Sequence, residues 1–220
     1  MIIGVDQSLT STGVAILVDE LIVDSFIIKS APNVIELSKK ILKTEDKFNE
    51  ILHDHPTVIS GLVFWDREKD SVATSKPKAG MFKYEKKALK ITPELRIRII
   101  LMAFHDRVSA AEKKYGKASL IINETPAISA SGQVVTLGQL LGSFQGYGFV
   151  RGIKAVAISP LTLKSFAGVK GKDKNLMEEA LLTIDREYVA NIDDAKKDDI
   201  VDAIHLARYA EAKKIGEVRK

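Results

Sequence analysis

The stretch IIGVDQSLTSTGVAIL, residues 2–17, holds one acid, Asp6, between two apolar runs. Residues 2–5 and 13–18 are rich in aliphatic and β-branched side chains, and a Ser/Thr cluster separates them. This pattern predicts two strands joined by a short turn. A third apolar run at residues 21–28 follows closely, so we expect a meander of three antiparallel strands. Asp6 is then expected at the end of the first strand.

Helical and strand-like patterns alternate further along the chain. Thr92 precedes a proline in the first helical position, and the apolar spacing that follows predicts a helix as far as Gly116. Further strands are predicted at residues 119–123 and 153–158, and further helices at residues 133–150, 175–188 and 198–210. The order βββαβαβαα predicts an α/β domain with a mixed five-stranded sheet flanked by helices, in which the later strands are parallel. This is the ribonuclease H-like fold.

Residues 31–91 do not fit that plan, and we interpret them as an insertion between the third strand and the first core helix of one domain over residues 1–220. A helical period and a strand-like run come first. The segment SKPKAGMFKYEKKALK, residues 75–90, then places lysines around Phe82 and Tyr84, which is typical of a segment that contacts phosphates and stacks on bases. A solvated loop is the alternative. The DNA-binding candidates in this segment are Lys76, Lys78, Lys83, Lys86 and Lys87.

Composition limits the chemistry. The 220 residues include 33 Lys and Arg against 29 Asp and Glu, and the net charge of +4 permits a polyanionic partner. There is no cysteine, so a disulfide framework, a thiolate metal site and a thiol nucleophile are excluded. Any metal has to be held by Asp, Glu, His or carbonyl oxygen. No uncharged stretch reaches membrane-spanning length, and we expect a soluble cytoplasmic protein with no membrane partner.

Four acids are expected to emerge at strand ends or on one helix face. Glu124 ends the apolar run SLIINE directly before a residue pair, Thr-Pro, that stops strand pairing. In KKDDIVDAIHLARYA, residues 196–210, Asp199 and Asp202 are three residues apart and share a helix face. Two such acids repel each other unless a cation lies between them. Together with Asp6, these acids suggest a site of carboxylate oxygens for two Mg²⁺ ions, which Mn²⁺ could replace. Such a site would catalyse phosphodiester hydrolysis. Each acid alone is better explained as a turn former or a helix cap, and it is the combination of the four that indicates an active site.

Three segments together carry a resemblance. Residues 2–17, LIINETPA at 120–127 and KKDDIVDAIHLA at 196–207 resemble the RuvC family of Holliday-junction resolvases, which are ribonuclease H-like nucleases. The resemblance implies Mg²⁺-dependent paired nicking of four-way DNA junctions by a homodimer. The catalytic and metal-binding acids that it implies are Asp6, Glu124, Asp199 and Asp202. It also implies a basic residue near the scissile phosphate, for which Lys174 is the best match, and Lys164 and Lys172 are further DNA-binding candidates.

The chain departs from the family at three places. The insertion, residues 31–91, has no counterpart in the compact members, so the path of DNA across this protein is expected to differ. Gln7 and Ser8 follow the first acid where cellular resolvases usually have Pro-Gly, and this is more similar to the divergent phage-type and viral branches. For a phage-encoded protein the expected location is the host cytoplasm. Some relatives carry an aromatic wedge after the second acid, whereas this chain offers only Ile128, so a cleavage-site preference does not transfer.

Glycines recur at a spacing of four residues in the predicted helix 133–150, at Gly138, Gly142 and Gly146. Each weakens a helix by about 1 kcal/mol relative to Ala, so we expect something to approach this face closely. The sheet beneath, the same helix of a second subunit and a DNA backbone are the alternatives. A two-fold dimer would supply the two cuts that a near-symmetric junction needs.

Several other polar residues have a simpler interpretation. His205 follows Asp202 by three residues and could lie on the metal side, but a packing role is the simpler reading. Asp198 points about 100° away from Asp199 on a helix and suits a capping or solvent-facing role. The cluster Ser8, Thr10 and Thr12 is better explained by turn hydrogen bonds than by nucleophilic catalysis.

Three alternative functions stay open. The chain could cut flaps or forks with the same chemistry, or bind branched nucleic acid without cutting it. DQSLTSTG, residues 6–13, also resembles the first phosphate-binding hairpin of actin-like ATP-binding proteins. That third alternative requires a second domain half, and it leaves Glu124 and the two helix acids unexplained.

Overall fold

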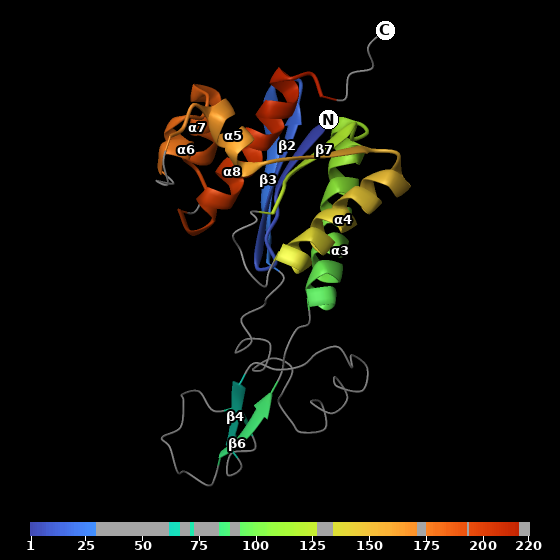
Figure 1. Ribbon diagram of the computed structural model, residues 1–220, viewed down its shortest axis with the longest axis vertical. Coiled ribbons are helices and arrows are strands. Elements are labelled where there is room, and N and C mark those ends of the chain that lie inside the picture. Colours follow the sequence, from blue (N-terminus) through green and yellow to red (C-terminus); the bar gives the residue numbers. More distant parts are fainter. Residues whose placement is uncertain are drawn as a thin grey trace. The chain divides into compact units, whose positions relative to one another are not determined.

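The strand that ends in Asp6 lies at the centre of a five-stranded sheet (Figure 1). β1 (Ile2–Asp6), β2 (Ser11–Val18) and β3 (Leu21–Lys29) form an antiparallel meander. β7 (Leu120–Glu124) pairs in parallel with β1, and β8 (Lys154–Ile158) pairs in parallel with β7. The strand order is β3-β2-β1-β7-β8. The predicted ribonuclease H-like arrangement, a mixed five-stranded sheet, is therefore confirmed.

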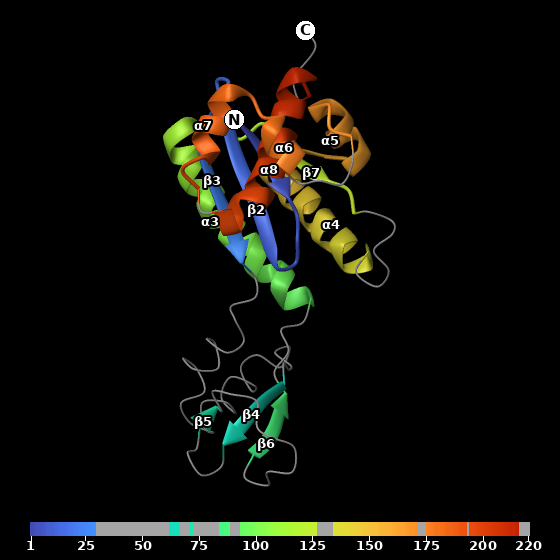
Figure 2. The same cartoon turned by 90° about the vertical axis from the view of Figure 1, so that its left-hand side faces the viewer.

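Helices cover both faces of this sheet, as the two views in Figures 1 and 2 show. α3 (Pro93–Tyr115) and α4 (Val134–Arg151) lie on one face. The helices on the other face are α5 (Pro160–Ala167), α6 (Asn175–Glu179), α7 (Thr183–Val189) and α8 (Asp194–Ala212). None of the helices in the described part of the chain is long and apolar enough to cross a membrane.

The computed structural model describes residues 1–29, 62–66, 71–72, 84–88, 93–126, 134–170, 175–192 and 194–215. The chain divides into two compact units, Met1–Lys29 with Ile99–Lys220, and Ser30–Arg98. In the second unit, a small antiparallel sheet has the order β5-β4-β6. Its strands are β4 (Leu62–Asp66), β5 (Ser71–Val72) and β6 (Tyr84–Ala88). The extent of the insertion, residues 31–91, stays a prediction, and its expected helix lies outside the described residues.

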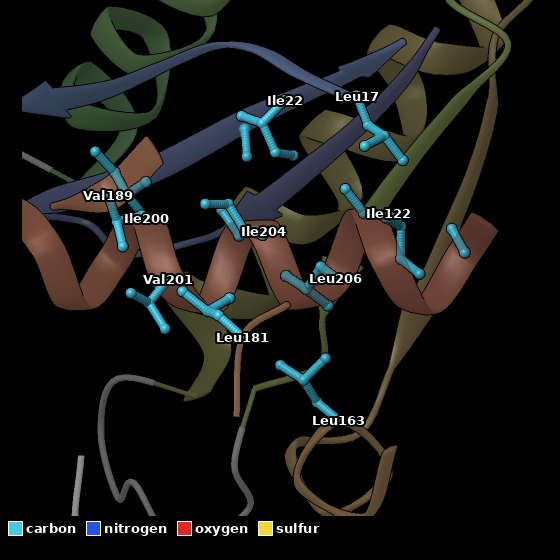
Figure 3. Close-up of a cluster of buried hydrophobic side chains, with 14 of the residues drawn as sticks. Leu17, Ile22, Ile122, Leu163, Leu181, Val189, Ile200, Val201, Ile204 and Leu206 are labelled. Carbon is cyan, nitrogen blue, oxygen red and sulfur yellow. The ribbon is translucent and has the colours of Figure 1, made fainter. Parts of the chain in front are cut away.

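α8 packs directly on the backbone of β1 and β2. A Cβ atom at Gly4 would lie 2.0 Å from the carbonyl oxygen of Ala203, and one at Gly13 would lie 2.1 Å from the carbonyl oxygen of Asp199. The two glycines therefore let the helix approach the strands closely. Around this contact, apolar side chains of the sheet and of the helices form the main core (Figure 3). Its members include Leu17, Ile22, Ile122, Leu163, Leu181, Val189, Ile200, Val201, Ile204 and Leu206.

Two predictions about helices need correction. The pattern at residues 175–188 forms two short helices, α6 and α7, instead of one. At the break, the guanidinium of Arg186 donates hydrogen bonds to the carbonyl oxygens of Glu179 and Leu181, which replace the helical partners of these carbonyls. α5 was not predicted, although its signals are local: the Ser159 hydroxyl accepts a hydrogen bond from Thr162 N, and Gly168 ends the helix at φ 72°.

Of the three alternatives for the glycines of α4, the structure excludes the sheet beneath. No described atom outside the helix lies within 4 Å of a Cβ built at Gly138, Gly142 or Gly146. The glycine that meets the sheet is Gly148, whose Cβ would lie 2.8 Å from the carbonyl oxygen of Ile153. The four-residue stripe is exposed, and Phe144 instead holds α4 against Phe104 of α3 with the ring centroids 5.0 Å apart.

Candidate active site

Asp6 and Glu124 are the last residues of two neighbouring parallel strands, β1 and β7. The register pairs Val5 with Asn123, so the two acids occupy equivalent positions one residue further along. Side chains alternate between the faces of a strand, and Gly4, two residues before Asp6, faces α8. Ile122, two residues before Glu124, belongs to the core beneath α8. Both carboxylates therefore lie on the α8 side of the sheet, at its carboxyl end.

Asp199 reaches the same end of the sheet from α8. Gly13 is the β2 partner of Asp6, and the backbone of Asp199 lies against Gly13. The hydroxyl of Ser11 donates a hydrogen bond to Oδ2 of Asp199 at 2.5 Å. Asp199 therefore lies against β2, next to the residue that pairs with Asp6 of β1. A glycine contact holds its backbone, and a hydrogen bond holds its carboxylate.

Asp202 interacts with Glu124 through their charges. Burial raises the pKa of Glu124 to about 7, and the negative charge of Asp202 adds to this rise. The positive charge of Lys164, on α5, acts in the opposite direction. Glu124, at a strand end, therefore interacts with the charges of Asp202 on α8 and Lys164 on α5.

α6 packs beside the acids of α8. Nζ of Lys197 lies 2.6 Å from Oε1 of Glu178, and this ion pair joins the first turns of α8 to α6. A small pocket between the two helices is lined by Met177, Glu178, Asp198, Val201 and Asp202. Asp202 therefore borders an opening in the surface.

His205 is buried and lies 2.7 Å, through Nε2, from the carbonyl oxygen of Met177. Burial lowers the pKa of its imidazole, which favours the neutral ring, and Nε2–H of this ring donates a hydrogen bond to the carbonyl oxygen. This contact favours the packing interpretation of His205 over metal ligation.

The donor set suits a hard cation, because all four acids offer carboxylate oxygen. The repulsion between Glu124 and Asp202 is also what a cation between them would relieve. Within the described residues, however, no group of three or more His, Asp or Glu side chains is arranged to hold a metal ion. The Mg²⁺ site therefore stays a prediction.

The structure describes three of the lysines predicted to bind DNA or phosphate. Lys164 is half-buried on α5, and its charge acts on Glu124. Lys86 and Lys87 lie on β6, where they pair with Phe64 and Val63 of β4. The remaining candidates lie outside the described residues: Lys76, Lys78, Lys83, Lys172 and Lys174. Ile128 lies outside them as well.

The loop between β1 and β2 is closed by its own hydroxyls. The Thr12 hydroxyl donates to the Ser8 carbonyl oxygen at 2.6 Å and accepts from Ser8 N at 3.3 Å. The hydroxyls of Ser8 and Thr10 lie 3.2 Å apart. These contacts confirm that the cluster serves turn hydrogen bonding.

Two polar contacts beside the acids were not predicted. One is the bond from Ser11 to Asp199. The other joins Asn123 to Gln7: Nδ2 of the fully buried Asn123 donates to Oε1 of Gln7 at 3.4 Å. Oδ1 of Asn123 and Nε2 of Gln7 are buried without a hydrogen-bond partner. The only sequence signal was an amide inside the apolar run that ends in Glu124.

No protein-family model matches this chain, and no curated protein matches it by sequence. Among solved structures, it is similar to RuvC of Thermus thermophilus, with 14% identity, 96% of each chain covered and a TM-score of 0.49. It is also similar to T. thermophilus RuvC in complex with a Holliday junction substrate, with 11% identity, a TM-score of 0.47, and 96% of this chain and 95% of that chain covered. A likeness of this degree does not by itself identify a function.

Proposed function

We propose that this protein is a metal-dependent DNA endonuclease that resolves Holliday junctions and related branched DNA by paired nicks. The observation that supports the proposal is that two acids end adjacent parallel strands, β1 and β7, and that the helix carrying the other two acids packs on β1 and β2. Asp6 and Glu124 come from adjacent strand ends, and Asp199 and Asp202 come from the helix that packs on them. The preference for junctions rests on the sequence resemblance to the RuvC family.

Asp6, Glu124, Asp199 and Asp202 would hold Mg²⁺, which supplies an activated water and stabilises the departing oxygen when it is bound. The protein's own residues prepare this site. Ser11 orients the Asp199 carboxylate, and the contact at Gly13 fixes the start of α8 on the strands. Lys164 adds a positive charge beside Glu124, where it would also attract a DNA phosphate. We expect hydrolysis to leave a 5′-phosphate and a 3′-hydroxyl.

We assign DNA binding to two sets of lysines. Lys164 lies on α5, and Lys172 and Lys174 follow that helix in the sequence. The insertion contributes Lys76, Lys78, Lys83, Lys86 and Lys87. Phosphate contacts of this kind weaken as salt concentration rises, because binding releases condensed counterions. Selectivity for branched DNA would come from its geometry, since junction arms bend more easily than continuous duplex.

A homodimer is proposed through the exposed face of α4. Apart from Arg151, this helix carries no charged residue. Its glycine stripe has open space around it, and large apolar side chains extend the stripe at both ends: Val135 is 73% exposed, Phe149 87% and Val150 82%. Exposed apolar surface of this kind is typical of an interface, and glycines let two helices approach closely. A second subunit would place a second active site on the other strand of a junction.

Cleavage of a synthetic four-way junction tests the proposal. Matched duplex, flap and fork substrates are incubated with the protein in Mg²⁺, in Mn²⁺ and in EDTA. We expect symmetric nicks in the junction with either metal and none in EDTA. Cleavage of flaps or forks alone would keep the nuclease and contradict the resolvase. Binding of junctions without cleavage would favour a binding module, and saturable ATP binding would favour the actin-like alternative.

A further inference from the structure

We infer that Ser11 is a positioning residue for the metal site: its hydroxyl holds the Asp199 carboxylate in the orientation that a divalent cation requires. This inference rests on the proposed function, and it assigns a role to a residue of β2 that carries no charge. Ser11 would act through Asp199, without contact to the metal or to DNA.

The geometry at Asp199 carries the inference. Oγ of Ser11 donates to Oδ2 of Asp199 at 2.5 Å, and both side chains are partly buried. A hydrogen bond to an ionised carboxylate is stronger than one between neutral groups, and partial burial reduces competition from water. Ser11 and Asp199 are 188 residues apart in the sequence, so the bond forms only when α8 has packed on β2.

The donor is held by the sheet. Ser11 is the first residue of β2 and pairs with Lys29 of β3. The Ser8–Thr12 bonds close the loop on its other side. Two residues further along, Gly13 lies against the Asp199 backbone, where a Cβ would come within 2.9 Å of the Asp199 Cβ. β2 therefore restrains Asp199 at its backbone and at one carboxylate oxygen, so the side chain would lose little conformational freedom when a cation binds.

Groups that orient metal ligands have a characteristic effect. Their removal typically weakens metal affinity or activity by about 10- to 100-fold while the ligands themselves remain. A bond that served only to attach α8 to β2 would instead lower stability in the absence of metal and leave the metal affinity of the folded protein unchanged. The two roles are therefore distinguished by metal affinity measured on folded protein.

The experiment compares wild-type protein with Ser11→Ala, Ser11→Cys and Ser11→Thr. Ser11→Cys keeps the shape with a weaker donor, and Ser11→Thr keeps the hydroxyl. Thr10→Ala is the control, because it removes an exposed hydroxyl of the same loop that bonds to Ser8. Mg²⁺ affinity is measured by calorimetry, nicking is measured against Mg²⁺ concentration, and thermal unfolding in EDTA establishes that each variant is folded.

For Ser11→Ala we expect the dissociation constant for Mg²⁺ to rise about 10- to 100-fold, with nicking restored at saturating Mg²⁺. Ser11→Cys should show a smaller rise, and Ser11→Thr and Thr10→Ala should match the wild type. Wild-type Mg²⁺ affinity in folded Ser11→Ala or Ser11→Cys would overturn the inference and leave the proposed function intact. A wild-type protein that neither binds Mg²⁺ nor nicks DNA would overturn both.

Discussion

At the residue scale, neighbouring groups act in opposite directions on the pKa of Glu124. Burial and the charge of Asp202 raise the pKa of its carboxyl group to about 7, and Lys164 lowers it. In the metal-free protein, Glu124 is therefore expected to hold its proton at pH values where an ordinary glutamate is ionised. A cation that binds the ionised form would release this proton, so metal binding is expected to be weaker at acidic pH.

The raised pKa predicts how stability depends on pH. Between pH 4.5 and 7, the folded protein holds a proton on Glu124 that the unfolded chain has lost, so stability falls as pH rises. Glu124→Gln removes this titration. In EDTA, we expect the wild-type free energy of unfolding to fall relative to that of the variant by about 2 kcal/mol across this range, after discounting for solvent screening.

Urea unfolding at a series of pH values measures this difference. Glu187→Gln, which changes an exposed glutamate on α7, serves as the control. A constant difference between wild type and Glu124→Gln at all pH values would show that Glu124 titrates normally.

Individual site residues were predictable to the extent that they interrupt a pattern. Asp6 and Glu124 each end an apolar run, and Asp199 and Asp202 are spaced to share a helix face, so sequence spacing alone marks them as candidates. The bond from Ser11 to Asp199 and the contact of Asn123 with Gln7 join residues 188 and 116 positions apart. No local spacing encodes such pairs, because they depend on how the strands and α8 pack.

At the element scale, the close packing of α8 on β1 and β2 determines where the helix acids lie. A side chain at Gly13 would overlap the backbone of Asp199, and one at Gly4 would overlap the backbone of Ala203. Glycine is required at these positions because of the space that α8 occupies. The sequence shows the glycines, but the partner of each is visible only in the fold.

Gly13→Ala is therefore expected to move α8 away from β2, in which Gly13 pairs with Asp6 of β1. The added Cβ would lie 2.1 Å from the Asp199 carbonyl oxygen. We expect the free energy of unfolding to fall by about 3 kcal/mol, as in overpacked cores, and Mg²⁺ affinity to fall with it. Gly142→Ala, made in a Phe149→Glu background that removes the proposed α4 interface, is the matched control, because no described atom outside the helix lies near its Cβ, and it should raise stability by up to about 1 kcal/mol. Urea unfolding of both variants makes the comparison, and equal stability of Gly13→Ala and wild type would contradict the packing.

The helix predictions show which signals are local. α3 begins at Pro93 and ends before Gly116, as its capping residues predict. α5 also has local caps, Ser159 and Gly168, and could have been predicted from them. The break between α6 and α7 could not, because it depends on the tertiary position of Arg186 and on the burial of Leu181.

At the scale of the whole molecule, the directions of the strands followed from the sequence, because short turns make antiparallel neighbours and βαβ crossovers make parallel ones. The sequence did not show which helix faces remain exposed. A glycine stripe can pack inward or lie open, and only the position of α4 shows that Gly148 faces β8 while Gly138, Gly142 and Gly146 face outward.

The proposed dimer predicts a mass near twice the chain mass of 24.2 kDa in light scattering. Phe149→Glu places a charge in the exposed apolar face and should shift the protein to a monomer, because a buried unpaired charge is costly. Met102→Glu is the control, since Met102 is exposed on α3. The α4 interface is contradicted by a wild-type monomer, or by a Phe149→Glu protein that stays dimeric.

The most direct test of the central claim is nicking of a four-way junction by Asp6→Asn, measured together with junction binding in EDTA. The substitution keeps the shape of the side chain at the end of β1 and removes its charge, and Asp106→Asn on α3 provides the same change away from the site. We predict that Asp6→Asn binds the junction as the wild type does and loses Mg²⁺-dependent nicking by at least about 100-fold, while Asp106→Asn keeps both. Full nicking by Asp6→Asn would contradict the assignment of these acids as the active site.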